Sequence, residues 1–280
     1  MQVYLLGTRG SIPSSGAEFT HYGGKTSCVA IGPDGQVPSL ILDAGSGLAA
    51  AGWAIGDAPF RGSIVLSHVH WDHVLGLPFF REGDRPGSEV ELLVPQQDDD
   101  AEDVLHRFFS PPLFPIDING LRGNWTSRLI QPGEYVIQNF TVTIRDVPHK
   151  GGRTFGFRIS DGSTTVAYLP DHSPTSFGAG PHGDGAHHEA ALELAAGADL
   201  LIHDSQYTPE EFVDRFDWGH CVYSYPIGLA DAAGVRQTVL FHHDPFRTDA
   251  EIDALHESVG RPDVSFAVER SVISLAPPPE

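Results

Sequence analysis

The chain has 280 residues, 40% of them hydrophobic, which is enough to bury a substantial core in one sizeable domain or two small ones. Its formal net charge is −20, from 17 basic and 37 acidic residues, and such a surface repels long nucleic acid, so we expect a small-molecule partner. Two cysteines are too few for a disulfide scaffold, and neither a signal peptide nor a membrane-spanning apolar run is recognisable, which predicts a cytoplasmic protein without a membrane partner.

The first third of the chain is expected to form strands joined by tight loops. Short apolar runs predict strands at residues 3–7, 28–31, 39–42 and 63–66. Asp and Gly at residues 43–47 predict a tight turn, followed by a short helix at residues 48–52.

The rest of the chain mixes strands and helices. Strands are predicted at residues 89–94, 141–144, 164–169 and 237–241, and helices at residues 100–109, 189–196, 225–233 and 249–259. This layout favours two sheets packed back to back with helices outside. We expect residues 1–280 to form a single domain with a lid-like insertion near residues 96–128. The apolar, proline-stiffened segment 108–115 in it either walls a site or fills a gap in the core.

The most informative segment follows the strand at residues 63–66. It places His68, His70, Asp72 and His73 within six positions. Imidazole and carboxylate are ligands of borderline and hard divalent metals. His68 and His70 point to the same side of an extended segment, whereas Asp72 and His73 follow a turn and can face a second ion. The spacing therefore indicates a metal site at the edge of a sheet.

Three later predicted strands also end in residues that can bind a metal. They lead into His149, into Asp171 and into the neighbouring pair His242 and His243, in that order. Together with the first cluster, these motifs resemble the metallo-β-lactamase superfamily over nearly the whole chain.

The resemblance implies an α/β fold, the four-layer αββα sandwich of that superfamily, with two metal ions at the sheet edge. By resemblance, one ion is held by His68, His70 and His149, and the other by Asp72, His73 and His242, with Asp171 bridging them. His242 aligns with the family pattern, and His243 remains the alternative for this last position. Asp43 matches an aspartate that accepts the outward N–H of a ligand histidine, although an Asx turn would also explain it. The histidine-rich donor set favours Zn²⁺, while Mn²⁺ and Fe²⁺ also suit the carboxylates.

Three further segments indicate a branch of the superfamily. Residues 7–13, 201–205 and 218–221 resemble motifs of ribonuclease Z and its small relatives. In those relatives a histidine matching His220 leans over the scissile phosphate, and an acidic residue matching Asp204 orients it. We therefore assign catalytic roles to His220, Asp204 and Asp72. Weaker candidates for contact with the substrate phosphate are Arg9, Lys25 and Arg153.

These observations predict a dinuclear metal-dependent hydrolase. The leading hypothesis is a phosphodiesterase that cleaves a small or cyclic nucleotide-type phosphodiester through a metal-bridging hydroxide. The alternatives are a carboxyl-ester, lactone or thioester hydrolase, a ribonuclease Z-like endoribonuclease, and a metal-binding protein without activity. The negative charge and the absence of a long basic insertion argue against the ribonuclease. Relatives on this branch often form dimers, so a homodimer is a further expectation from the resemblance.

Overall fold

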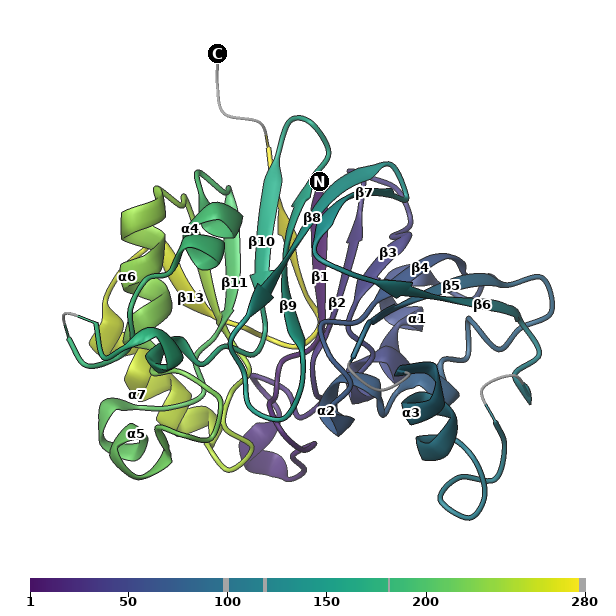
Figure 1. Ribbon diagram of the computed structural model, residues 1–280, viewed down its shortest axis with the longest axis horizontal. Helices are drawn as coiled ribbons and strands as arrows, with labels where there is room; N and C mark the ends of the chain where they lie inside the picture. Colours follow the sequence, from purple (N-terminus) through teal and green to yellow (C-terminus); the bar gives the residue numbers. More distant parts are fainter. Residues whose placement is uncertain (98–100, 118–119, 181, 277–280) are drawn as a thin grey trace.

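Two mixed sheets of seven strands each lie face to face in the protein (Figure 1). The computed structural model describes residues 1–97, 101–117, 120–180 and 182–276, without the side chains of residues 101–104. Within these residues, the first sheet is built mostly from the N-terminal half of the chain and the second from the C-terminal half.

The first sheet has the strand order β14-β1-β2-β3-β4-β5-β6. Its members from β3 to β6 run parallel, whereas β1 pairs antiparallel with both β2 and β14. The strands predicted at residues 3–7, 28–31, 39–42, 63–66 and 89–94 are present within two residues of their predicted ends, and β6 and β14 were not predicted. The bounds are β1 (Gln2–Gly7), β2 (Cys28–Gly32), β3 (Leu40–Leu42), β4 (Arg61–Val65), β5 (Glu89–Pro95), β6 (Asn124–Ile130) and β14 (Ser271–Ser274).

The second sheet has the order β13-β12-β11-β10-β9-β8-β7. Strands β10 to β13 run parallel, and β7 to β10 alternate in direction. The apolar runs at residues 141–144, 164–169 and 237–241 correctly located β8, β10 and β12. The bounds are β7 (Gly133–Ile137), β8 (Phe140–Val147), β9 (Thr154–Ser160), β10 (Thr165–Leu169), β11 (Leu200–Asp204), β12 (Thr238–Phe241) and β13 (Val264–Phe266).

The core between the sheets consists of alternate side chains from facing strands. Val3 and Leu5 of β1 are buried against Phe155, Phe157 and Ile159 of β9 and their neighbours. Residues two apart on a strand share one face, so each strand contributes alternate positions to this layer. The tight packing holds the two sheets in one fixed relation, and with them the loops at their ends.

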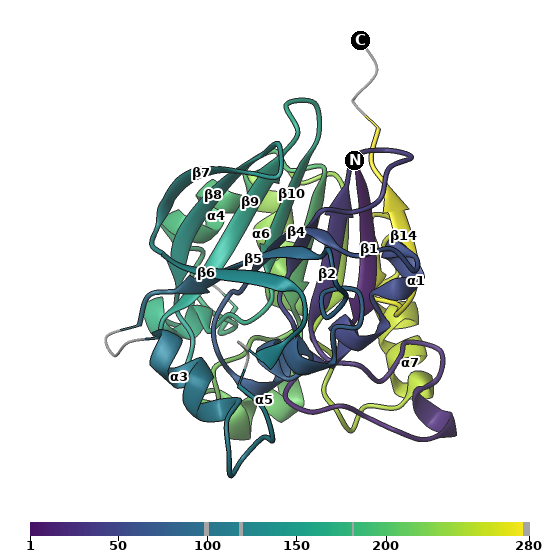
Figure 2. The ribbon, with the colours of Figure 1, turned by 90° about the vertical axis from the view of Figure 1, so that its right-hand side faces the viewer.

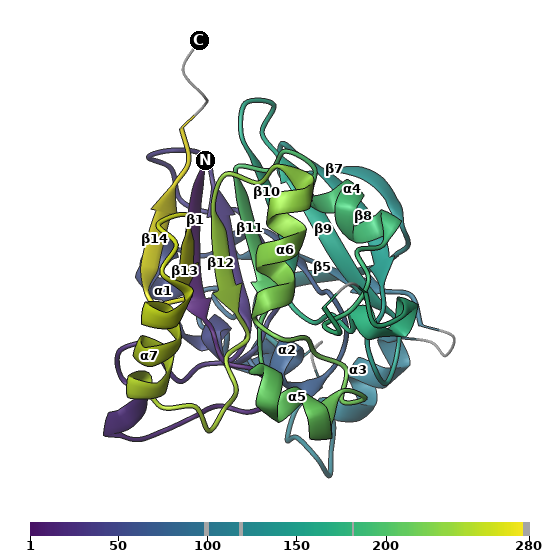
Figure 3. The ribbon, with the colours of Figure 1, turned by 90° about the vertical axis from the view of Figure 1, so that its left-hand side faces the viewer.

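Helices cover the two outer faces, which confirms the predicted four-layer arrangement (Figures 2 and 3). The first sheet carries α1, α2 and α3, and the second carries α4, α6 and α7, with α5 near its lower end. The bounds are α1 (Gly52–Ile55), α2 (Trp71–Val74), α3 (Ala101–Phe108), α4 (Glu189–Ala195), α5 (Pro209–Arg215), α6 (Ser224–Ala233) and α7 (Asp249–Val259), with short 3-10 turns η1 (Ala17–Phe19), η2 (Ser46–Ala50), η3 (Leu77–Phe79) and η5 (Pro174–Phe177). The helix predicted at residues 48–52 is thus a 3-10 turn that leads into α1.

Local sequence explains where the helices begin and end. Helix α7 begins after Thr248, whose side chain accepts from the amide of Glu251 while the Glu251 carboxylate accepts from the amide of Thr248. It ends at Gly260, in the left-handed region at φ 58°, where glycine has no Cβ to clash.

Segment 108–115 packs against the outer core of the first sheet. Phe109 is buried there, Phe108 stacks on Trp71 with 6.1 Å between ring centroids, and Phe114 lies edge-on to Phe79. The segment therefore packs on the outer core of the first sheet, and its Phe108 contacts Trp71, whereas the lid-like role stays a prediction. The start of the helix predicted at Asp100 lies outside the described residues. No helix within the described ranges is long and apolar enough to cross a bilayer.

Candidate metal centre

The loops that follow four strands converge at one edge of the two sheets. His68 follows β4, His149 follows β8, Asp171 follows β10 and His242 follows β12. Strands β10 and β12 are parallel to each other, and β8 points the same way because two antiparallel pairings separate it from β10. Parallel strands end at the same edge, so residues more than a hundred positions apart meet there.

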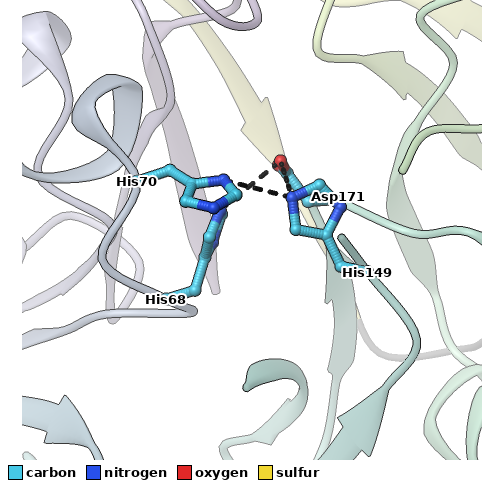
Figure 4. Close-up of side chains that lie close together, drawn as sticks. All are labelled: His68, His70, His149 and Asp171. Carbon is cyan, nitrogen blue, oxygen red and sulfur yellow. Dashed lines mark hydrogen bonds and ion pairs between the residues drawn. The ribbon is translucent and has the colours of Figure 1, made fainter. Parts of the chain in front are cut away.

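The first cluster contains His68, His70, His149 and Asp171 (Figure 4). Asp171 Oδ2 lies 3.6 Å from His68 Nε2 and 3.4 Å from His149 Nε2. His149 Nε2 lies 3.2 Å from His70 Nδ1. Figure 4 shows the three imidazoles and the carboxylate pointing toward one common space. One candidate ligand atom from each residue thus lies within reach of a single ion.

The second cluster contains Asp72, His73, His242 and again Asp171. Asp171 Oδ1 lies 3.0 Å from His73 Nε2 and 3.2 Å from His242 Nε2. Asp72 Oδ2 lies 3.1 Å from His242 Nε2. The two oxygens of Asp171 therefore face different clusters, which is the geometry a carboxylate needs to bridge two ions.

Several buried atoms of the clusters have no hydrogen-bond partner among the described residues. They are His68 Nε2, His73 Nε2 and Asp171 Oδ1, and all three point into the clusters described above. A buried polar atom without a partner costs about 1–3 kcal/mol, so such atoms usually serve a ligand or an ion. Their chemistry, two imidazole nitrogens and a carboxylate oxygen, fits a divalent metal.

The charge states of the donors also fit a metal. Burial lowers the pKa of His68 well below its usual range, and burial lowers the pKa of His149 to about 4, so both imidazoles are neutral, as ligands must be. Burial alone would raise the pKa of Asp171, but the surrounding imidazoles, His242 foremost, hold it well below its usual range. Burial would lower the pKa of His73, yet Asp171, Asp72 and Asp43 raise it well above its usual value. The carboxylates of Asp171, Asp72 and Asp43 thus favour a positive charge at His73.

The outward nitrogens of three imidazoles are held by neighbouring acceptors. Asp43 Oδ2 lies 2.9 Å from His73 Nδ1, as the resemblance implies. The carbonyl of Gly219 lies 2.6 Å from His149 Nδ1, and Gln206 Oε1 lies 3.0 Å from His242 Nδ1. With a proton on each outward nitrogen, the inward Nε2 atoms keep their lone pairs for a metal. Gly219 and Gln206 were not predicted for these contacts.

The loop after β1 closes the second cluster with its backbone. The amide of Ser11 donates to Asp72 Oδ2 at 2.7 Å. A Cβ on Gly10 would lie 2.3 Å from His242 Nδ1, so only glycine fits beside this imidazole. The glycine-containing motif at residues 7–13 therefore lets the chain pass directly over the cluster.

We expect Asp43→Asn to lower the affinity for divalent metal about 10- to 100-fold, as loss of an outer hydrogen-bond acceptor typically does. The Asp43 carboxylate accepts from the Ser67 amide at 2.7 Å and from the Tyr168 hydroxyl at 2.8 Å besides contacting His73, so an amide cannot satisfy all three donors. Competition with a chromophoric chelator measures the affinity. Tyr168→Phe, which keeps the carboxylate, serves as the control with a smaller expected loss. An Asp43→Asn protein that binds metal as tightly as the wild type contradicts the assigned role.

His220 lies beside both clusters and is held by Asp204. Its Nδ1 lies 2.9 Å from Asp204 Oδ2 and 3.9 Å from Asp171 Oδ2. Asp204 ends β11 and is fixed in turn by the amides of His172 and Gln206. Burial would lower the pKa of His220, but Asp204 and then Asp171 raise it to about 9. The two carboxylates thus favour the protonated form of an imidazole that lies next to the candidate metal centre.

His242 takes the last position of the second cluster, and the alternative, His243, does not. His243 is buried on the other side, where its Nε2 donates to the carbonyl of Ala267 at 2.8 Å and its ring stacks on Phe266. His242 directly follows β12 and has a left-handed backbone at φ 61°, and the chain there directs the two neighbouring imidazoles to different sides.

The three basic residues proposed for phosphate contact lie elsewhere, which corrects that expectation. Arg9 is fully buried and donates to the carbonyls of Gly23, Asp244 and Arg247. Lys25 pairs with Glu269, and Arg153 pairs with Asp146 at 2.6 Å. None of the three lines either cleft at the candidate centre. Their loops are close to the site in sequence, but their side chains satisfy buried carbonyls or surface carboxylates instead.

Two adjoining clefts open onto the clusters. The first has a volume of about 360 Å³ and is lined by Ser11, Val69, His70, Trp71, Asp72, Asp171 and His220. The second, of about 500 Å³, shares Ser11 and His220 with the first. A small molecule can therefore reach both candidate ion positions and His220 from solvent.

Comparison with known proteins agrees with the fold. The family model of the beta-lactamase superfamily domain matches residues 40–243. A ribonuclease Z of Natronomonas pharaonis is 21% identical, with 86% of each chain covered. The crystal structure of the metallo-beta-lactamase fold protein YhfI from Bacillus subtilis superposes with a TM-score of 0.70 at 20% identity, covering 98% of this chain and 99% of that one. A diphosphatase from the PhnP family gives a TM-score of 0.72 at 18% identity, covering 99% and 98%. The chain therefore belongs to the beta-lactamase superfamily and has the fold of its metal-dependent hydrolases.

Proposed function

We propose that the protein is a dinuclear metal-dependent phosphodiesterase that acts on small phosphodiesters of nucleotide type. The observation that carries the proposal is the buried pair of His220 and Asp204 beside two metal-binding clusters that share Asp171. A cationic imidazole at this place suits a reaction in which negative charge builds on phosphoryl and leaving-group oxygens.

The two clusters offer different sets of donor atoms to the two ions. Three imidazoles of the first cluster favour Zn²⁺, whereas the carboxylates of Asp72 and Asp171 in the second also suit Mn²⁺ or Fe²⁺. When bound, a pair of divalent ions lowers the pKa of a water toward neutrality and stabilises charge on phosphoryl oxygens.

Residues of the protein then donate a proton to the leaving oxygen and orient the reacting groups. The water loses one proton to solvent and its oxygen bonds to phosphorus, while the bond from phosphorus to the leaving oxygen breaks. His220 gives its Nε2 proton to that oxygen and regains a proton from solvent. Asp204 holds Nδ1 and so aims Nε2 at the substrate. Asp72, ionised and lining the first cleft, orients the attacking water.

Size and charge support a small substrate over a long nucleic acid. The first cleft holds about 360 Å³, which suits a phosphodiester with small substituents. The chain carries a formal charge of −20, which disfavours a polyanion such as tRNA.

We expect metal-stripped protein to regain hydrolysis of bis(p-nitrophenyl) phosphate when it is reloaded with Mn²⁺ or Zn²⁺. A p-nitrophenyl ester and a lactone, assayed beside it, are expected to show little turnover. Release of p-nitrophenolate and metal content by mass spectrometry give the two readouts. Turnover of the ester or lactone alone would instead favour a carboxyl-ester or lactone hydrolase.

A further inference from the structure

A second cleft adjoins the candidate metal centre on the far side of His220. It has a volume of about 500 Å³, and its walls come from the loop after β1, from helix α5 and the residues after it, and from the loop after β12. His220 and Ser11 line both clefts. The two clefts are therefore continuous at His220 and Ser11, and there is room on both sides of this imidazole.

Large apolar side chains surround the second cleft and remain exposed. Trp218 is 57% exposed, Phe246 is 80% exposed and Ile12 is 56% exposed. Single exposed apolar residues are common, but three around one concave surface form a hydrophobic site for a ligand. Trp218 and Phe246 come from separate segments, so their shared position is a property of the folded chain.

The indole of Trp218 contacts the guanidinium of Arg215. The Arg215 guanidinium lies 5.6 Å from the Trp218 ring centroid and 5.4 Å from that of Tyr207, and it is tied to Asp244 Oδ2 at 3.2 Å. Cation–π contacts of this kind favour one orientation of the ring. Trp218 is therefore a preformed flat wall, which suits stacking against another planar ring.

The charges of the cleft balance one another. Lys150 pairs with Asp217 at 3.2 Å, and Arg215 pairs with Asp244. The cleft thus neither repels the substrate, as an acidic surface would, nor offers an uncompensated cation for a second phosphate. Its occupant is expected to be a neutral, planar group.

We infer that this cleft binds the leaving group of the substrate, and that the leaving group carries a planar aromatic ring such as a nucleobase. The inference rests on the proposed phosphodiesterase function. His220 lines both clefts, so the ester substituent that passes it into the second cleft has its oxygen nearest the imidazole, and this substituent is the leaving group. Cleavage of the phosphorus–oxygen bond then releases a neutral alcohol, such as a nucleoside, and leaves a phosphomonoester at the clusters.

The test compares two diesters that differ only in the leaving group, methyl naphthyl phosphate and methyl trifluoroethyl phosphate. With Zn²⁺- or Mn²⁺-loaded protein, Trp218→Ala and Phe246→Ala are each expected to lower kcat/KM for the naphthyl diester about tenfold, mainly through KM, because stacking on one aromatic contributes about 1–3 kcal/mol. The kcat/KM for the trifluoroethyl diester should stay within about twofold, since that leaving group does not stack.

Phe216→Ala is the matched control. Phe216 is 58% exposed and lies two residues from Trp218, but it does not line the cleft, so both substrates should react as with wild type. Equal loss on both substrates, or no loss on the naphthyl diester, overturns the inference while the proposed function stands. Absence of any diester hydrolysis by the wild type overturns the proposed function. In that case the affinity for adenosine monophosphate, measured by calorimetry, decides the inference, because equal affinities of wild type and Trp218→Ala contradict it.

Discussion

Replacing Asp171 with Asn is expected to abolish metal-dependent hydrolysis and to lower the metal content from two ions to one or none. Asp171 is buried, and its two oxygens lie 3.0–3.6 Å from imidazoles of both clusters. The amide of Asn keeps the shape of the side chain but removes the negative charge. Two divalent ions about 3.5–4 Å apart repel each other strongly in a buried site, and without a shared anion they cannot both remain.

Metal analysis, activity and thermal unfolding of the same Asp171→Asn preparation separate this effect from misfolding. A folded variant with little metal and no turnover is the expected result. Asp231→Asn, which alters a surface carboxylate paired with Arg261, controls for the loss of one charge and should keep both metal and activity. Full activity with two ions bound would show that Asp171 is not the bridge.

His220→Ala is expected to lower kcat about 10²- to 10⁴-fold while the metal content stays unchanged. The imidazole lies at the mouth shared by both clefts, and Asp204 Oδ2 lies 2.9 Å from its Nδ1. Removing it takes away the proton donor for the leaving oxygen but none of the donors in the two four-residue clusters. Asp204→Asn keeps the imidazole and weakens its orientation, so a smaller loss of kcat is expected.

Metal content again discriminates between the roles of His220. Together with Asp204 and His242, it forms a third group of donor atoms within 4.8 Å of one another. If His220→Ala loses an ion, the residue is a ligand rather than the proton donor. If kcat and metal content both stay at wild-type values, His220 has no part in the reaction.

The candidate ligands were predictable because each follows a short apolar run along the chain. Val65 and Phe241 are buried ends of β4 and β12, and the polar cluster that follows each run marks where the strand leaves the core. Strand β9 was not predicted, although Phe155, Phe157 and Ile159 alternate along it in the pattern of a strand with one buried face. Its position between β8 and β10 follows only from the pairing of the strands.

The residues that hydrogen-bond the candidate ligands from outside the clusters could not be predicted from the sequence in this way. Gln206 contacts His242 across 36 positions because β11 and β12 are adjacent parallel strands, with Asp204 opposite Phe241. Strand pairing of this kind depends on the whole sheet. The second cleft has the same origin, since Trp218 and Phe246 share it only after α5 and the loop after β12 come together.

The sequence by itself determined a layered α/β fold and the places where His and Asp follow apolar runs, because hydrophobic periodicity and the residues at strand ends are local properties. The order and roles of the candidate ligands came from the resemblance to the superfamily. The tertiary structure decided between His242 and His243, since the direction of each side chain depends on the left-handed turn of the backbone at His242, directly after β12. The tertiary structure also buries the side chain of Arg9, whose guanidinium donates hydrogen bonds to buried backbone carbonyls. Those carbonyls come from segments up to 238 positions away, and only packing brings them to Arg9.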